Sequence, residues 1–219
     1  MAQRSWSSSA QAAPQRWPLI QSQAGAGAWP LVVVVHGHGG GAVPAVLQSL
    51  LDEVSEARSA AVWVQALTAE PVELPPAQKL LLVPLLLTPG SHVRVDVPGI
   101  RQRLRELGHE VMCLPFLGAW QPWLQHLRQL GCDAESQVVV HHPLRPGIAD
   151  RYLHVLSQVI GLPLRSADSC DAGLDRVLPL ALAPNRMTAH LGSQQGGGLA
   201  LLEHPATREF LFELLLDLP

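Results

Sequence analysis

The sequence predicts an α/β fold made of two lobes, each with a parallel sheet flanked by helices, the second lobe being shorter than the first. From Trp29 onward, short apolar runs alternate with helix-length amphipathic segments, which is the pattern of βαβ units. Apolar residues make up 47% of the chain and charged residues only 15%, as strands buried under helices on both faces require. Both observations favour mostly parallel sheets.

The first series of elements contains four apolar runs that predict strands and two amphipathic segments that predict helices. The stretch between Pro71 and Leu80 is short and contains Pro75 and Pro76, so the helix expected there is truncated or missing. The predicted strands are 31–35, 61–67, 80–87 and 110–114, and the predicted helices lie near 42–57 and 98–107.

The second series is a shortened repeat of the first. VVVVHGHGG at 32–40 is similar to VVVHHPLRP at 138–146, and VPLLLTPG at 83–90 is similar to LPLALAPN at 178–185. A duplicated lobe is therefore expected, with the first lobe at 29–132 and the second at 133–219. The second series has predicted strands at 137–141, 177–182 and 199–202, a helix near 148–160 and a closing helix.

Residues 1–28 are rich in Ser, Ala, Gln and Gly and contain no acidic residue, which is typical of a disordered tail. The tail has no apolar core of the kind found in a secretory signal. A transit peptide is the minority interpretation, because the tail has only two arginines and little amphipathic pattern.

Charge and composition exclude several classes of function. The formal net charge is -3, so no broad positive field is available to hold nucleic acid. No apolar run approaches the roughly 20 residues that a membrane-spanning helix needs. The 3 cysteines are an odd number without CxxC spacing, which argues against a disulfide framework and favours a reducing compartment. We therefore expect a cytoplasmic protein without nucleic-acid or membrane partners.

Two histidines follow predicted strands at the edge where ligands bind in open α/β sheets. His36 comes directly after the first strand, and His92 follows the third strand through a turn that contains Pro89 and Gly90. Neighbouring parallel strands lie about 4.8 Å apart, so residues beyond their ends can face one site. Neutral imidazole binds divalent metals and accepts protons near pH 7, which makes this pair a candidate metal site.

The segments around these histidines resemble the sirohydrochlorin chelatases of the CbiX-like and SirB-like class. HGHGGG at 36–41 and VPLLLTPGSHVRVDVP at 83–98 carry the resemblance, the second more specifically, through Gly90, His92 and the Asp-Val-Pro at 96–98. Glu-Pro at 70–71 and Leu-Gly at 117–118 are weaker matches. Together the matching segments lie between about residues 31 and 130.

The resemblance implies flavodoxin-like lobes and a lyase that inserts Co, Fe or Ni into sirohydrochlorin or a related tetrapyrrole during cobalamin or sirohaem synthesis. It implies that His36 and His92 are the metal-binding and catalytic pair, with the metal as substrate and no permanently bound cofactor. A monomer or homodimer acting on a small molecule is expected. Candidate substrate-binding residues are Gly37, Glu70, Ser91 and Arg94.

The chain also departs from the family pattern. His38, Gly39 and Gly40 stand where family members carry a small polar residue and an arginine. In the second lobe Met187 occupies the position equivalent to His92, so the metal site of that lobe is expected to be lost. Whether the adjacent pair His141 and His142 contributes to the site of the first lobe is left open by the sequence.

Two other functions compete with the chelatase interpretation. A metal-binding or carrier protein of the same fold would use His36, His38 and His92 as a closed three-ligand site, so the direction of His38 discriminates between the two. An α/β hydrolase is suggested by a strand followed by His-Gly-x-Gly-Gly, which also describes an oxyanion loop. No GxSxG occurs in the chain, so the hydrolase hypothesis lacks its nucleophile.

Overall fold

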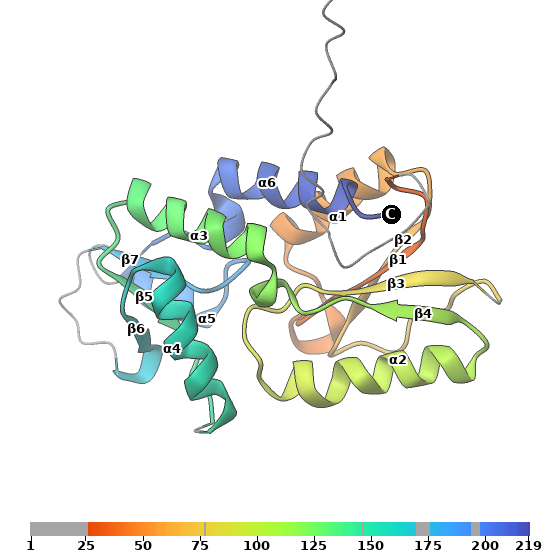
Figure 1. The fold of residues 1–219 in the computed structure, drawn as a ribbon, viewed down its shortest axis with the longest axis horizontal. Helices are drawn as coiled ribbons and strands as arrows, with labels where there is room; N and C mark the ends of the chain where they lie inside the picture. The colour runs from red at the N-terminus through yellow and green to blue at the C-terminus, as the bar shows by residue number, and fades with distance from the viewer. Residues whose placement is uncertain (1–25, 77, 146, 170–175, 194–197) are drawn as a thin grey trace, which may run out of the picture.

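The structure is a computed structural model that describes residues 26–76, 78–145, 147–169, 176–193 and 198–219. The predicted disordered tail therefore lies outside the described residues up to residue 25. Within the described part, two parallel sheets are flanked by helices, and the second sheet is the smaller (Figure 1). This confirms the α/β class and the two-lobed arrangement.

The sheet of the first lobe has the order β2-β1-β3-β4, with all neighbours parallel. β1 is central and every one of its five residues is completely buried, as expected for a run of one leucine and four valines. The four predicted strands are confirmed. Their bounds are β1 (Leu31–Val35), β2 (Val62–Ala66), β3 (Lys79–Pro84) and β4 (Glu110–Cys113).

Alternate residues of these strands face opposite layers, because side chains along a strand point up and down in turn. Val33 and Leu81 face the layer that contains α1 (Ala45–Ala57), whereas Val32 and Leu82 face α2 (Val97–Glu106). No helix lies between β2 and β3 in the part of that link that the structure describes, which confirms the missing helix.

The second sheet has the order β6-β5-β7, again all parallel. The predicted helix at 148–160 is confirmed as α4 (Ile148–Ile160). The sequence interpretation missed β6 and the short helix α5 (Arg186–Ser193). The strands are β5 (Val138–His141), β6 (Leu164–Ser166) and β7 (Val177–Pro179).

The strand predicted at 199–202 is wrong, because this segment ends in a 3-10 turn at Leu201–Glu203. The Glu203 carboxylate accepts a hydrogen bond of 2.7 Å from the Ala200 N–H and so closes the turn. Pro205 then begins the last helix, and its lack of an N–H suits the first turn of a helix better than a strand.

Each lobe contributes one helix that packs against the other lobe. After β4 the chain enters α3 (Gln121–Asp133), which packs against α4 of the second lobe. The last helix, α6 (Pro205–Leu216), returns to the first lobe and packs against α1 (Figure 1). One continuous apolar core consequently includes Val33 and Leu81 of the first sheet, Val139 of the second, and Leu211 of α6.

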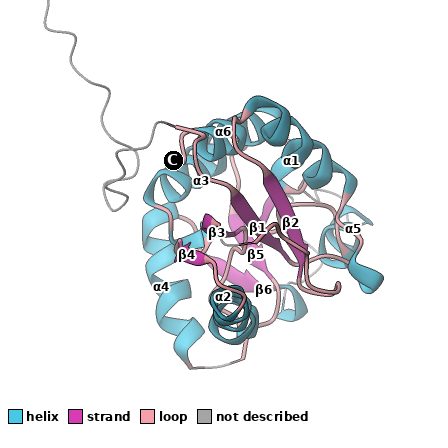
Figure 2. Ribbon diagram, turned by 90° about the vertical axis from the view of Figure 1, so that its right-hand side faces the viewer, coloured by secondary structure: helices cyan, strands magenta, loops and turns pink. Residues whose placement is uncertain are grey.

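Helices surround the strands on both sides (Figure 2). The predicted boundary between lobes at 132/133 coincides with the last turn of α3. None of the described helices combines the length and the apolar character that crossing a membrane requires.

Arg58 joins the end of α6 to the first lobe. Its guanidinium donates hydrogen bonds to the carbonyls of Leu215 (2.7 Å), Leu218 (3.0 Å) and Trp29 (2.8 Å). It also donates to an oxygen of Pro219 at 2.7 Å. Only 7% of Arg58 is exposed, and burial lowers its pKa to about 10, which leaves it charged at neutral pH. A buried cation thus replaces its water shell with four backbone oxygens.

Candidate functional site

His36 is positioned by a tight turn at the carboxyl end of β1. Gly37 follows with a φ of +71°, which L side chains rarely adopt. A Cβ at Gly37 would lie 2.7 Å from Thr68 Oγ1 and 2.9 Å from the Ala66 Cβ, at the end of β2. The glycine therefore lets the chain turn sharply against β2 and leaves the His36 side chain exposed at the edge of the sheet.

His92 is positioned by a single π-helical turn, His92–Asp96, that continues directly into α2. The predicted helix near 98–107 therefore begins earlier than expected. Pro98 has no N–H to donate to the Arg94 carbonyl, while the Val97 N–H reaches back five residues to the His92 carbonyl. The wide turn brings His92 and Asp96 onto one face.

The two predicted histidines meet. Their ring centroids are 4.8 Å apart and the ring planes are at 84°, an edge-to-face arrangement. β1 and β3, the strands that precede them, are direct neighbours in the sheet. Two imidazoles at this separation, both accessible from outside, are a suitable pair of nitrogen ligands for one divalent ion.

Hydrogen bonds fix the tautomer of both rings. His36 Nδ1 lies 2.8 Å from the Gly37 carbonyl oxygen, so Nδ1 carries the proton. His92 Nδ1 lies 2.6 Å from Asp96 Oδ2 and donates its proton to that carboxylate. Each Nε2 then has a lone pair, and neither has a hydrogen-bond partner among the described residues. This is the arrangement of metal-binding histidines, in which a second group orients the ring.

Replacing Asp96 by asparagine should weaken Co²⁺ binding by about tenfold while both histidines are kept, because the carboxylate orients His92 and fixes its tautomer. Calorimetric titration with Co²⁺ measures this effect. Asp52→Asn is a matched control, since Asp52 accepts a hydrogen bond from Gln48 at the same i,i+4 spacing on the exposed face of α1. Equal Co²⁺ affinities in the two variants would contradict the role given to Asp96.

Of the predicted substrate-binding residues, Gly37 and Ser91 directly adjoin the two histidines in the chain, and Arg94 follows His92 by two residues. Ser91 and Arg94 are exposed; Arg94 belongs to the same π-helical segment as His92, and Ser91 is the residue just before that segment. Glu70 is exposed in the link after β2, where Gln65 Nε2 donates to the Glu70 carbonyl at 3.3 Å. Among the described residues, no three His, Cys, Asp or Glu side chains form a metal-binding group, so the structure does not bring Glu70 into a three-ligand site.

His38 is exposed, and its backbone carbonyl accepts a hydrogen bond of 2.6 Å from Thr68 Oγ1. It does not complete a three-histidine group with His36 and His92 within the described part of the chain. This arrangement favours an open two-ligand site over the closed site that a metal carrier would need.

The second lobe repeats half of the site. His141 ends β5 as His36 follows β1, and its Nδ1 donates to the next carbonyl, that of His142, at 2.7 Å. Burial, and then the nearby rings of His36 and His141, lower the pKa of His142. Met187, at the position equivalent to His92, is buried under the second sheet, which removes the second ligand from this lobe.

His142 is held by Asn185, whose side-chain amide donates to His142 Nε2 at 3.2 Å. The orientation of Asn185 is fixed because its Oδ1 accepts hydrogen bonds from the backbone N–H groups of Met187 and Thr188 at 2.9 and 3.1 Å.

The loop before His92 comes close to the loop after β5. A Cβ at Gly90, two residues before His92, would lie 3.9 Å from the side chain of Leu144. We call the loops that carry His36, His92 and the His141–His142 pair the histidine edge.

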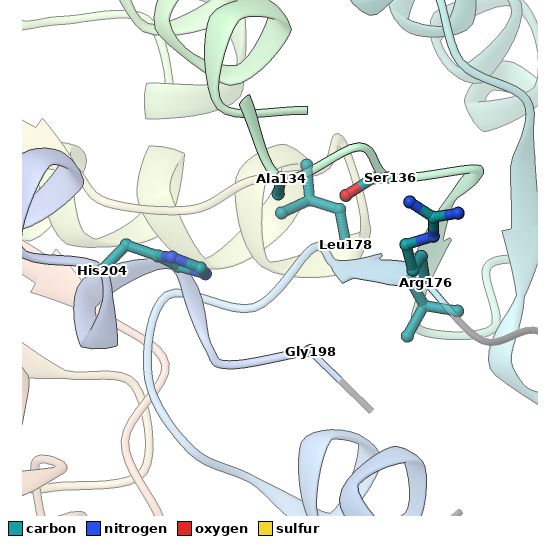
Figure 3. Close-up of a pocket in the computed structure, with 7 residues that line it drawn as sticks. Ala134, Ser136, Arg176, Leu178, Gly198 and His204 are labelled. Carbon is teal, nitrogen blue, oxygen red and sulfur yellow. The ribbon is translucent and has the colours of Figure 1, made fainter. Parts of the chain in front are cut away.

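A pocket of about 150 Å³ lies elsewhere in the second lobe (Figure 3). The pocket lies at the amino ends of β5 and β7, whereas parallel sheets bind ligands at the carboxyl ends of their strands. Its charged residue, Arg176, forms an ion pair with Glu135. The lining residues are Ala134, Ser136, Arg176, Val177, Leu178, Gly198 and His204.

Two further histidines, His109 and His126, are buried or half-buried although their neighbours in the sequence are polar. Only 6% of His109 is exposed, and its Nδ1 accepts a hydrogen bond of 3.2 Å from the Gln78 N–H. His126 is half-buried between α3 and α6, stacked on Phe210 with a centroid separation of 4.5 Å. Both rings contact residues far away in the sequence, Gln78 and Phe210, which the local sequence pattern does not indicate.

Comparison with solved structures finds two proteins of this fold. The first is the sirohydrochlorin chelatase SirB from Bacillus subtilis subspecies spizizenii in complex with cobalt, with a TM-score of 0.53 and 16% identity, covering 86% of this chain and 94% of that one. The second is CbiX, described as the terminal enzyme for siroheme biosynthesis in denitrifying bacteria, with a TM-score of 0.52 and 18% identity, covering 84% of this chain and 96% of that one. No family model and no curated protein matches the sequence.

Proposed function

We propose that this chain belongs to the sirohydrochlorin chelatases and inserts a divalent metal ion into a tetrapyrrole. The observation that carries the proposal is the His36–His92 pair, with ring centroids 4.8 Å apart and a lone pair left on each Nε2. The SirB and CbiX folds support it, and so does the order of the two histidine motifs along the chain.

The chemistry needs an ion that is bound and then released. In the proposed reaction the metal ion is a substrate and binds to Nε2 of His36 and Nε2 of His92. Two protein ligands hold an ion loosely and leave coordination positions for the pyrrole nitrogens. As the ion moves to the macrocycle, two pyrrole protons leave, and the two imidazoles that have released the metal can each accept one at Nε2 before passing it to water.

The tetrapyrrole is proposed to lie at the histidine edge. Arg94 is exposed in the turn that begins at His92, and its guanidinium is suited to bind a substrate carboxylate. Ser91 and Gly37 adjoin the two histidines and are proposed to contact the ring, and Glu70 to act as an acid or proton acceptor near its rim.

We propose Co²⁺, Fe²⁺ or Ni²⁺ as the metal substrate, because imidazole binds all three and selection depends on geometry and supply. The biological role would be a lyase step in cobalamin or sirohaem synthesis. A cytoplasmic monomer or homodimer without a permanently bound cofactor is the form in which we expect it to act.

The direct test mixes the purified full-length chain with sirohydrochlorin and Co²⁺ and follows the absorbance of the macrocycle. Insertion should be faster than in a protein-free mixture at the same pH, with Fe²⁺ and Ni²⁺ measured in parallel. If none of the three metals is inserted faster than in the protein-free mixture, while Co²⁺ still binds, the carrier function replaces the chelatase.

A further inference from the structure

Tyr152, on α4 of the second lobe, contacts two loops of the first lobe through its hydroxyl group. The oxygen lies 2.8 Å from the Leu87 carbonyl and 2.9 Å from the Gly118 carbonyl. Leu87 follows β3 and Gly118 follows β4, so one side chain joins the ends of two neighbouring strands to the other lobe. The hydroxyl has one proton, which it shares between the two carbonyls.

The surroundings of Tyr152 keep this contact intact. Its ring lies against Phe116, with a centroid separation of 5.6 Å, and burial raises the pKa of Tyr152 well above its usual value. The phenol therefore remains protonated and remains a donor near neutral pH. A hydrogen bond removed from water in this way contributes more than an exposed one, because its partners cannot turn to solvent instead.

Gly118 leaves space for the contact. A Cβ at this position would lie 2.1 Å from the Leu87 carbonyl oxygen and 2.6 Å from the Tyr152 hydroxyl. Any residue other than glycine would therefore push apart the three groups that meet here. The Leu-Gly at 117–118 thus has a physical reason: it allows the loops after β3 and β4 to approach each other and α4.

The contact is made by segments that adjoin the histidine edge along the chain. Leu87 precedes His92 by five residues in the loop after β3, and α4 follows the loop that carries His141 and His142. His36 and His92 both belong to the first lobe and are oriented by their own neighbours, Gly37 and Asp96. The Tyr152 contact therefore bears on how the two lobes are placed relative to each other and not on the pair itself.

We propose that the Tyr152 hydroxyl is a positioning group that fixes the spacing of the two lobes at the histidine edge and thereby the affinity for a flat macrocycle bound there. The part concerning the macrocycle rests on the proposed function. The part concerning lobe spacing does not. Metal binding is independent of Tyr152, because both metal-binding nitrogens come from one lobe.

The test is Tyr152→Phe, which removes the hydroxyl and keeps the ring against Phe116. Hydrogen exchange of the full chain should become faster in peptides that cover 85–92 and 116–120. KM for sirohydrochlorin should rise about fivefold, the size expected for loss of one buried hydrogen bond, with kcat and the Kd for Co²⁺ changed less than about twofold. The KM effect without a kcat effect distinguishes positioning from general damage.

Ser157→Ala is the matched control, because the Ser157 hydroxyl donates to the Leu162 carbonyl at 2.7 Å, also from α4 but within the second lobe. It should change neither the exchange of the first-lobe loops nor KM. Gly118→Ala is a second variant that disturbs the same contact from the first lobe, and it should reproduce the pattern of Tyr152→Phe.

Unchanged exchange in both loops would overturn the role of Tyr152 in lobe spacing. Faster exchange with unchanged KM would overturn its role toward the macrocycle, and an equal loss of Co²⁺ affinity would show that it acts on the histidine pair instead. If the unaltered chain inserts no metal into sirohydrochlorin, the proposed function fails, and the exchange measurement still decides whether Tyr152 fixes the lobes.

Discussion

His92→Ala is expected to lower kcat/KM for Co²⁺ insertion into sirohydrochlorin on the order of 10²- to 10³-fold, because a single imidazole holds the ion much more weakly and leaves only one base when the ion departs. His36→Ala should have an effect of the same size. The double variant should be little worse than either single one, since the two rings act as one unit. Initial rates of the absorbance change, measured at several Co²⁺ concentrations, give these values.

The controls for this result are two exposed histidines. His154, on α4, lies 3.1 Å from Gln158 through its Nε2, and His154→Ala should leave the rate unchanged. His38→Ala discriminates between an open and a closed metal site: a small effect supports the open pair, and a loss equal to that of His92→Ala supports a three-histidine carrier. Full activity in both His36→Ala and His92→Ala would remove the site assignment altogether.

Arg58→Met is expected to destabilise the fold by about 3 kcal/mol, because four backbone oxygens lose a charged donor while the methionine still fills the space. These oxygens belong to Leu215, Leu218, Pro219 and Trp29, at distances between 2.7 and 3.0 Å. The midpoint of urea unfolding, with its slope, measures the loss. Arg58 contacts Trp29, which precedes β1, whereas His36 follows the opposite end of that strand, so kcat of the folded fraction should be retained.

Arg128→Met is the control for charge and volume, since Arg128 is exposed on α3. Its free energy of unfolding should remain within about 0.5 kcal/mol of that of the parent chain, as is usual for surface substitutions. If Arg58→Met and Arg128→Met unfold at the same urea concentration, the four hydrogen bonds contribute nothing net and the apolar contacts of α6 alone hold it in place.

The sequence predicts well what depends on neighbouring residues. The apolar runs identify six of the seven strands described, because a parallel strand covered on both faces is a nearly continuous apolar run. Because the carboxyl ends of parallel strands lie at one edge of a sheet, the sequence predicts that His36 and His92 lie close together, and the structure confirms this proximity. β6 was missed because its three residues include Arg165 and Ser166, which give no apolar run.

Contacts between distant segments were not predictable. Arg58 reaches carbonyls 157 to 161 residues away, and Tyr152 reaches one 65 residues away, so no local pattern marks either residue. Asp96 is different. It was recognised as part of a motif but not as a partner of His92, although its i,i+4 spacing at the start of a helix is a usable signal.

The return of α6 to α1 has a consequence for how the protein is made. Leu211, Leu214 and Leu215 of α6 are fully buried in the same core as Leu50 and Leu51 of α1. While the chain emerges from the ribosome, that apolar face stays uncovered until the last helix has been synthesised, so the nascent first lobe is open to aggregation or chaperone binding. Anyone who wishes to produce that lobe by itself will have to supply a substitute for α6.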